Sequence, residues 1–153
     1  MAELQSMNSE YPEQLEVMFC IEGKNINPDE LTVILNIKPL KIIRRNDERK
    51  RKDTGEVLGY YTESYWVFSS YPFIKDTDVN VHLEWIFTKI TPHKKFLSAL
   101  KKKPAKLFIE VSCKLNEDFL STSYLIKAEN LSVMAEMGVD MGCVFIREKN
   151  EYT

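Results

Sequence analysis

The chain has 153 residues, of which 44% are hydrophobic and 29% are charged, and its formal net charge is −2. This length fits a single domain that buries roughly two-thirds of its unfolded surface, and the composition argues against a chain that is disordered throughout. No apolar stretch approaches the roughly 20 residues that span a bilayer, and the polar start is unlike a secretory signal, so we expect a soluble cytoplasmic protein.

The sequence predicts one domain over residues 15–147, with a flexible segment at 1–14 and a flexible tail at 148–153. Hydrophobic residues alternate along LEVMFCIE, which begins at Leu15 and is typical of a half-buried strand. The next stretch, INPDELTVILNIKP, predicts a helix that starts at Pro28.

The ends of this predicted helix have recognisable signals. Asn27 suits the N-cap, and the two acidic residues after Pro28 favour the positive end of the helix dipole. Pro39 follows the expected end of the helix.

A long β-hairpin is predicted next. Its strands are residues 40–45 and the aromatic-rich stretch 60–70, and between them lie a basic run and the turn residues Asp53 and Gly55. We expect the tip of this hairpin to project into water. By alternation, one strand face carries Tyr60, Trp66 and Phe68, and the other carries Tyr61 and Tyr65, so at least one of the two sets fills the core.

The second half of the chain predicts a helix from Asp78 that is interrupted at Thr91, where Pro92 can start a new helix. Four further elements follow, namely strands at 105–113 and 119–128, a helix at 129–138 and a strand at 139–146, whose inward residues would be Val139, Met141, Cys143 and Phe145.

The predicted order is β-α-β-β-α-β-β-α-β. We therefore expect an α+β fold in which a ferredoxin-like β-α-β-β-α-β core is extended by a further β-α-β, with a mainly antiparallel sheet and helices on one face.

The sequence offers no recognisable catalytic or metal motif. Its two histidines, His82 and His93, lack partners at ligand spacing and are expected on the surface or at a helix flank. Cys20, Cys113 and Cys143 lie in apolar strand-like runs, where reduced, buried thiols are expected. No Gly-x-Ser-x-Gly elbow and no glycine-rich phosphate loop is present. We predict a protein that is not an enzyme, with no metal and no cofactor.

Charge is distributed unevenly along the chain. Segment 41–52 has seven basic residues, and segment 94–106 has six lysines and no acid, which leaves 8 basic against 21 acidic residues elsewhere. Both segments have a simple structural interpretation, the first as a solvated hairpin tip and the second as a solvated lysine face near a helix C-terminus.

The favoured functional hypothesis is a non-enzymatic protein–protein interaction domain, in its sharpest form an immunity protein that neutralises a cationic toxin. The acids predicted to bind this partner are Glu22, Asp29, Glu30, Glu110, Glu117, Asp118 and Glu129. The alternative is binding of nucleic acid or an anionic ligand through hairpin 41–52 and lysines 94–106, in particular Arg44, Arg45, Arg49, Arg51, Lys101, Lys102 and Lys103. A third hypothesis is a small-molecule sensor with Trp66 in its pocket. No membrane contact is expected, and the oligomeric state is left open.

Four motifs carry a resemblance to a known family. They are the Pro-initiated helix from Pro28 to Pro39, the Trp-hydrophobic-x-Ser strand at 66–69, the HLEWI helix segment at 82–86, and the closing Leu-Ser…Gly-hydrophobic-Asp segment at 131–141. With these motifs the chain resembles domain of unknown function 4279 over roughly residues 15–146. The resemblance implies an α+β fold and a mostly bacterial source, and it implies no reaction.

Overall fold

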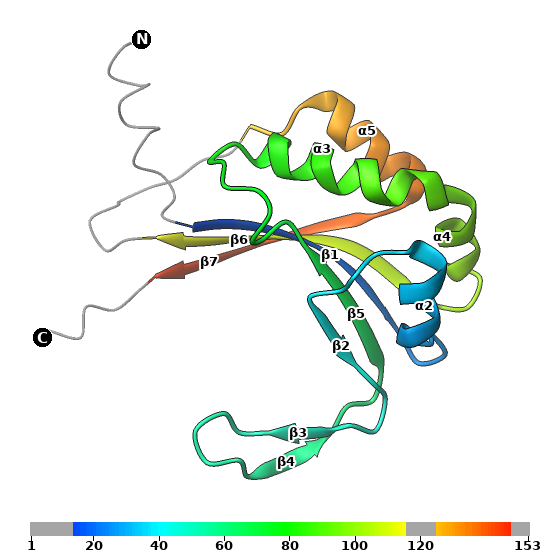
Figure 1. Ribbon diagram of the computed structural model, residues 1–153, viewed down its shortest axis with the longest axis vertical. Helices are drawn as coiled ribbons and strands as arrows, with labels where there is room; N and C mark the ends of the chain where they lie inside the picture. Colours follow the sequence, from blue (N-terminus) through cyan, green and yellow to red (C-terminus); the bar gives the residue numbers. More distant parts are fainter. Residues whose placement is uncertain (1–13, 116–124, 148–153) are drawn as a thin grey trace, which may run out of the picture.

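The computed structural model describes residues 14–115 and 125–147 (Figure 1). The strands of this part are β1 (Gln14–Gly23), β2 (Lys41–Ile43), β3 (Glu48–Lys50), β4 (Val57–Tyr60), β5 (Ser64–Ser69), β6 (Lys106–Leu115) and β7 (Asp140–Arg147). The helices are α2 (Pro28–Leu35), α3 (Val79–Ile90), α4 (Lys94–Leu100) and α5 (Ala128–Met137), with a 3-10 turn, η1 (Thr91–His93), between α3 and α4. The expected flexible segments 1–14 and 148–153 lie outside the described residues, except that Gln14 begins β1.

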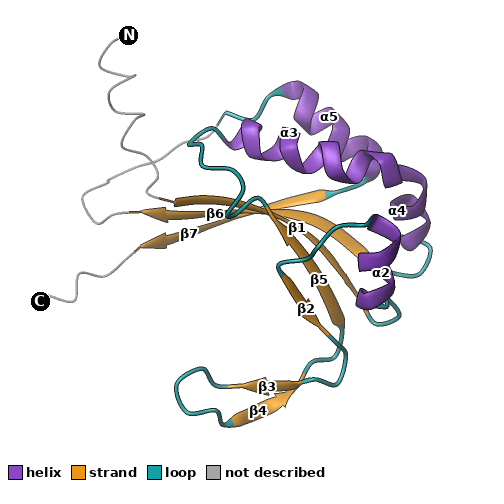
Figure 2. Ribbon diagram, viewed as in Figure 1, coloured by secondary structure: helices purple, strands orange, loops and turns teal. Residues whose placement is uncertain are grey.

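The architecture is α+β, with one mixed but mostly antiparallel sheet of five strands. The strand order is β2-β5-β1-β6-β7, and every neighbouring pair is antiparallel except β6 and β7, which run parallel. The helices α2 to α5 lie on one side of this sheet (Figure 2). β3 and β4 form a separate two-stranded ribbon that projects on the side away from α3 and α5. The predicted α+β class and mainly antiparallel sheet are confirmed.

β1 is the central strand, and its alternate residues form the middle of the core. It pairs with β5 on one side and β6 on the other, so that Phe19 lies between Phe68 and Ile109. Successive side chains of a strand point to opposite faces. The predicted apolar face of β1 is therefore buried under the helices, and its members are at most 6% exposed: Leu15, Val17, Phe19 and Ile21.

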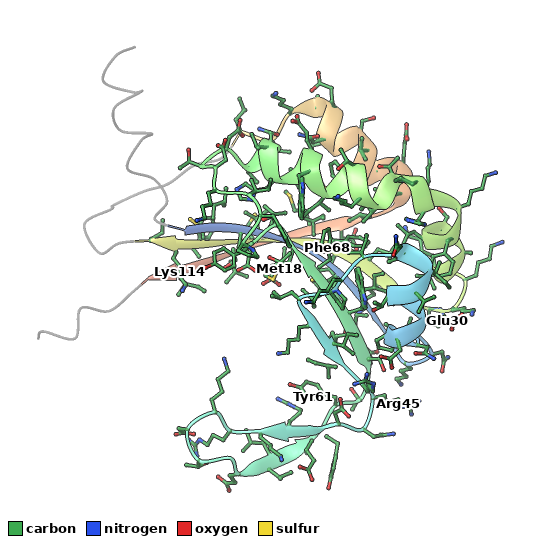
Figure 3. All side chains as sticks on the ribbon, in the orientation of Figure 1. Met18, Glu30, Arg45, Tyr61, Phe68 and Lys114 are labelled. Atoms are coloured by element: carbon green, nitrogen blue, oxygen red, sulfur yellow. The ribbon has the colours of Figure 1, made fainter. Side chains whose placement is uncertain are left out.

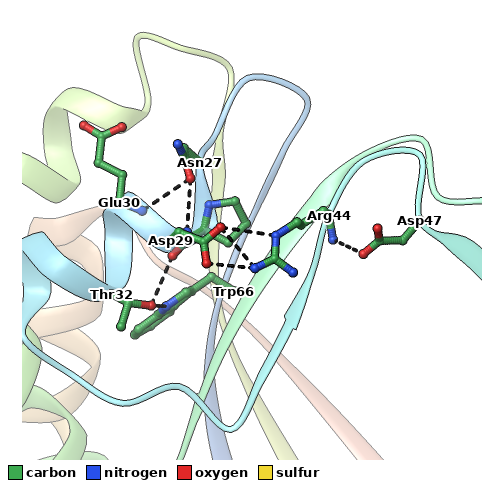
Figure 4. Close-up of polar contacts among 8 residues, drawn as sticks. Asn27, Asp29, Glu30, Thr32, Arg44, Asp47 and Trp66 are labelled. Atoms are coloured by element: carbon green, nitrogen blue, oxygen red, sulfur yellow. Dashed lines mark hydrogen bonds and ion pairs between the residues drawn. The ribbon is translucent and has the colours of Figure 1, made fainter.

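Helix α2 begins where the sequence predicts. The Asn27 side-chain oxygen accepts hydrogen bonds from the backbone N–H groups of Asp29 and Glu30, at 3.1 and 3.3 Å (Figure 4). The helix is joined to the sheet at the fully buried Trp66, whose indole N–H donates to Thr32 Oγ1 at 3.0 Å. This bond satisfies the one polar hydrogen of the indole ring, which allows the ring to be buried.

The predicted interruption of the long helix is confirmed. Asp78 caps α3, and its carboxylate accepts from the backbone N–H of Asn80 at 2.9 Å. Pro92 has no N–H to continue the α-helical pattern, so the chain tightens into η1 before α4 resumes at Lys94.

His82 is fully buried, and the expected surface or helix-flank position is wrong for this residue. Its Nε2 lies 2.7 Å from the backbone oxygen of Asp76, and its Nδ1 lies 2.7 Å from Ser70 Oγ. A carbonyl oxygen can only accept, so in the neutral ring Nε2 carries the proton and Nδ1 accepts from the Ser70 hydroxyl. Ser70 Oγ in turn accepts from the Val17 N–H at 3.0 Å. The imidazole thus joins the loop after β5 to both α3 and β1.

Asn80 joins the two long helices in a similar way. Its Nδ2 donates to Asp78 Oδ1 at 3.0 Å and to the Leu125 carbonyl at 2.7 Å. Its Oδ1 accepts from the Lys127 N–H and from Asn130 Nδ2, both at 2.9 Å. All the hydrogen-bonding capacity of this buried amide is used to hold the start of α5 against α3.

The predicted strand over 60–70 is in fact two strands. Tyr61 continues the projecting ribbon, because its N–H donates to the Asp47 carbonyl at 3.0 Å and its carbonyl accepts from the Asn46 N–H at 2.8 Å. Alternation is therefore not continuous through the stretch. Tyr60 is 60% exposed on the ribbon, whereas Trp66 is buried in the core.

The end of the chain also differs from prediction. The strand expected over 119–128 lies mostly outside the described residues, and in its described part 125–127 have no regular structure while Ala128 begins α5. Cys20 and Cys113 are buried as predicted, but Cys143 is exposed. Cys143 belongs to β7, an edge strand of the sheet, and a neighbouring strand protects such an edge on one side only.

Replacing His82 with phenylalanine should keep the ring volume but leave the Ser70 hydroxyl and the Asp76 carbonyl without their partner. Each unsatisfied buried group costs about 1–3 kcal/mol, so the urea midpoint should fall clearly at unchanged slope. His93→Phe is the control, because no described residue bonds to that half-buried ring. An equal loss of stability in the two variants would contradict the assigned role of His82.

Candidate functional site

The sheet face opposite the helices is a broad accessible surface, with Met18 and Lys114 on this side in Figure 3. Alternation assigns to it the residues of β1, β5 and β6 that do not enter the core. Most are intermediate in exposure, whereas Cys20 and Ser69 are buried and Lys106 is exposed. We call this surface the open face, and define it as Glu16, Met18, Cys20, Glu22, Tyr65, Val67, Ser69, Lys106, Phe108, Glu110, Ser112 and Lys114.

The centre of the open face is apolar and bordered by carboxylates. Val67, Cys20 and Phe108 lie side by side across β5, β1 and β6. Glu22 follows Cys20 along the same face of β1, and Glu110 follows Phe108 along β6. A surface of this kind can bury apolar area against a partner while it offers carboxylates to basic groups.

The Cys20 thiol is unreactive near neutral pH although it lies in this surface. Burial raises the pKa of its thiol to about 12, and the negative charges of Glu110 and Glu22 act in the same direction. The thiol therefore stays protonated near neutral pH, and the reactive thiolate form is scarce.

A projecting arm, residues 44–63, leaves the sheet after β2 and returns before β5. At its base, Asp47 Oδ2 accepts from the Arg44 N–H at 2.8 Å, and Asn46 takes a φ of 73°, which asparagine tolerates better than most residues. At its tip, Gly55 has a φ of 72°. Two-stranded ribbons have little independent stability, and this one leaves apolar residues 46–60% exposed: Val57, Leu58 and Tyr60.

A pocket of about 320 Å³ lies where the arm meets the open face, lined by Arg49, Tyr60, Tyr61, Thr62 and Tyr65. The rings of Tyr61 and Tyr65 meet edge to face, with centroids 6.1 Å apart. The Arg49 guanidinium carbon lies 5.7 Å from the Tyr61 ring centroid, within cation–π range. The pocket therefore combines aromatic walls with one cation.

A carboxyl pair lies beside this pocket. The hydrogen bond between Glu22 and Glu63 raises the pKa of Glu22, and burial and the negative charge of Glu63 act in the same direction, whereas Lys106 and a hydrogen bond with Tyr65 lower it. Burial raises the pKa of Tyr65 as well, and the charges of Glu22 and Glu63 add to the effect. Two carboxyl groups in contact favour the state in which they share one proton.

The structure intersperses acids among the basic residues of the arm. All of the ion pairs here are solvent-exposed, and such pairs contribute about 0–1 kcal/mol each. They are Arg44–Asp29 at 2.8 Å (Figure 4), Lys50–Glu48 at 3.0 Å, Arg51–Asp53 at 3.3 Å and Arg51–Glu56 at 3.7 Å. Arg45 and Arg49 make no ion pair with any residue of the described ranges. The arm thus carries mixed charge.

The lysines of segment 94–106 other than Lys106 belong to a different part of the molecule, whereas Lys106 begins β6 and lies opposite Glu22 on the open face. Lys101, Lys102 and Lys103 are exposed in the turn after α4, which lies in the helix layer, apart from the arm (Figure 1). The Lys101 ammonium lies against Gly138 at the C-terminal end of α5, where a cation is favoured by the helix dipole. Apart from Lys106, the lysines of this segment therefore do not join the arm in one surface.

The acids predicted to bind a partner are also divided. Glu22 and Glu110 both lie on the open face, on neighbouring strands. Asp29 and Glu30 lie in the first turn of α2, and Glu129 lies in the first turn of α5. Glu117 and Asp118 fall outside the described residues. The structure places Glu22 and Glu110 on one face, on opposite sides of the Cys20–Phe108 pair, and separates them from the other three.

Sequence reasoning missed the pocket and the open-face residues Met18 and Phe108. Because side chains alternate along β1 and β6, both residues are expected on the face opposite the core, and this pattern could have identified them. Contact between Glu63 and Glu22 had no local signal. It follows from the pairing of Gly23 with Ser64, which links parts of the chain about forty residues apart.

Two absences hold for the part of the chain that the structure describes. No group of three or more His, Cys, Asp or Glu side chains is placed to hold a metal ion. None of the described helices has the length and apolar character needed to cross a bilayer.

The fold and site define a small α+β domain with a one-sided helix layer, an open sheet face and a projecting arm. The chain belongs to the family described as Domain of unknown function (DUF4279), whose model matches residues 13–143. This match confirms the resemblance suggested by the four sequence motifs. No curated protein and no solved structure matches the chain.

We expect a thiol reagent at mildly alkaline pH to label Cys143 rapidly and Cys20 slowly in the folded protein. Cys143 is exposed, whereas the Cys20 thiol is buried and protonated. Mass spectrometry after a short pulse would count the adducts. The Cys143→Ser variant should be almost unlabelled until it is unfolded, and rapid labelling of folded Cys143→Ser at Cys20 would contradict the raised pKa.

The Glu22 carboxyl should titrate above the ordinary glutamate pKa, as followed by NMR of its side-chain carbon. Glu63→Ala removes both the hydrogen bond and the negative charge, so the pKa of Glu22 should fall. Lys106→Met removes an opposing positive charge, so the pKa should rise further. Shifts of the same sign in the two variants would show that the assigned causes are wrong.

Proposed function

We propose that this protein is a non-enzymatic interaction domain whose open face covers a basic surface of another protein. The specific form of this proposal is a bacterial immunity protein that acts in the cytoplasm and neutralises a cationic toxin. The proposal rests mainly on one observation, the apolar and acidic sheet face over which no described helix lies (Figure 2).

Burial of apolar area supports a protein partner. Val67, Cys20 and Phe108 form an apolar row at the middle of the face, and an uncovered apolar area of a sheet is a common contact site for proteins. The exposed Val57, Leu58 and Tyr60 of the arm lie on β4, which adjoins the pocket at the base of the arm. Tyrosine is enriched among the residues that dominate interface energies.

Charge supports a basic partner. Glu22 and Glu110 border the apolar row, and both lie close enough to Cys20 to raise the pKa of its thiol. The face also carries two lysines: Lys114 lies near one end, and Lys106 borders the row beside Glu22 and partly offsets its charge. Carboxylates around an apolar contact speed the approach of a basic surface and penalise an acidic one.

Binding of nucleic acid or an anionic ligand through hairpin 41–52 has less support. Three of its basic residues, Arg44, Lys50 and Arg51, already contact acids. Arg49 remains available at the pocket, so one small anionic group could be held there, but a phosphate backbone needs a row of cations.

We also propose the ferredoxin-like layout for the first four strands of the sheet. The order β2-β5-β1-β6 with antiparallel neighbours supports it, as do α2 between β1 and β2 and α3 between β5 and β6. In this interpretation α5 and β7 extend the unit at one edge.

The function is tested with a partner captured from a lysate and then purified. Glu22→Lys with Glu110→Lys should slow its association by about tenfold, because these changes reverse the charge of the contact surface, and added salt should slow the wild-type reaction.

The matched control is Glu30→Lys with Glu129→Lys, which changes the net charge equally but on the helix layer. This control should associate at nearly the wild-type rate. Equal slowing in both double variants, or a rate independent of salt, would contradict the proposed surface.

A further inference from the structure

The two edges of the five-stranded sheet differ in length and polarity. β2 at one edge has three residues and begins with the exposed Lys41. β7 at the other edge has eight, and its exposed apolar residues are Met141 (38%), Val144 (39%), Phe145 (51%) and Ile146 (41%). A short charged edge resists pairing with another strand, whereas a long apolar edge favours it.

We propose that two copies of this chain pair antiparallel through β7 and join their five-stranded sheets into one sheet of ten strands. In a continuous two-fold sheet the axis is perpendicular to the sheet, so the helix layers of both copies lie on the same side. A residue on the helix side of one sheet therefore faces a residue on the helix side of the second copy's sheet, and the same holds for the open side.

This requirement limits the register. Even-numbered residues of β7 share the open side of the sheet and odd-numbered residues share the helix side, as their pairing with β6 shows. An even-numbered residue must therefore face an even-numbered residue of the second copy. The two numbers in each facing pair then have the same even sum, so one residue faces its own counterpart at the axis. If that residue is Cys143, every residue from 140 to 146 has a facing partner.

With the axis at Cys143, the facing side chains are complementary in size. Gly142 faces Val144 of the second copy on the open side, and Met141 faces Phe145 of the second copy on the helix side. A small residue opposite a branched one leaves room for the branched side chain, and a thioether beside an aromatic ring is a favourable contact. The stretch from Met141 to Ile146 is free of charge, so no like charges meet along the pair.

Charge complementarity favours a second copy as the occupant of this edge. Asp140 would face Ile146 of the second copy, and Ile146 is paired in its own sheet with Lys114. Asp140 and Lys114 of the second copy then lie in one row, two strand spacings of about 4.8 Å apart, a gap that a long lysine side chain can largely cross. The two-fold axis produces this row twice.

The inference does not rest on the proposed function, because β7 borders the open face and leaves its centre uncovered. Pairing would extend the open face across both copies. Sedimentation of the full chain, under reducing conditions and over a wide concentration range, should show a dimer with twice the mass of the monomer.

The test variant is Gly142→Lys with Val144→Lys, which should be monomeric because the lysine at position 142 would directly face the lysine at position 144 of the second copy. A Cβ atom at position 142 meets no other atom within 4 Å in its own copy. The control is Val33→Lys with Leu131→Lys, which replaces two exposed apolar residues on the helix layer and should remain dimeric. A monomeric wild type at every concentration, or a dimeric β7 variant, would overturn the proposal.

A cross-link tests the register. Directly opposed residues of an antiparallel pair have Cβ atoms about 4.5–5.5 Å apart, close to the span of a disulfide. Diamide, which takes one hydrogen from each thiol, should therefore link the two Cys143 residues rapidly in the wild type and not in the β7 lysine variant.

Labelling of Cys143 by a small thiol reagent should remain fast in both proteins, which separates pairing from simple reactivity. Equal cross-linking rates would point to random collision and overturn the proposal. A β7-dependent dimer that fails to cross-link would overturn the register centred on Cys143.

Discussion

The alternation of side chains along β1 is the constraint on which the rest of the structure depends. β1 pairs with both β5 and β6, so its register positions the apolar residues of three strands at once. A slip by one residue would move Val17, Phe19 and Ile21 out of the core, and each such side chain is worth about 1.5–3 kcal/mol when buried. The sum is a large part of the 5–15 kcal/mol that usually stabilises a domain, which leaves one register acceptable.

The accessible features follow from this arrangement. The helix layer covers one sheet face, and the same alternation presents Cys20 between Glu22 and Glu110 on the other. The turn at Arg44–Asp47 takes the chain out of the sheet, so the arm and its pocket form beside the open face. Because the basic run of the arm is interleaved with acids, the open face is a better candidate for a recognition surface than the arm.

The fold was predictable where its signals are local. The Asn27 cap, the interruption at Pro92 and the alternating strands each depend on residues within a few positions of one another. The end of the predicted strand 60–70 was not predictable, because Tyr61 is held by the backbone of Asp47, fourteen residues away. Burial of His82 depends on a loop that supplies Ser70 and Asp76. The acids near the basic run were visible in the sequence, but the ion pair between Arg44 and Asp29 required the folded chain.

By itself, the sequence determined which faces of its segments are apolar, where its helices start, and the family to which the chain belongs. Only the tertiary structure decided that Glu22 meets Glu63, that Tyr61 and Tyr65 form a pocket with Arg49, and that β7 lies at an edge where Cys143 is exposed. The reason is the range of the interactions. Caps and alternation act within a turn or two of chain, whereas neighbours in a sheet are chosen by the burial of a shared core that no single segment contains.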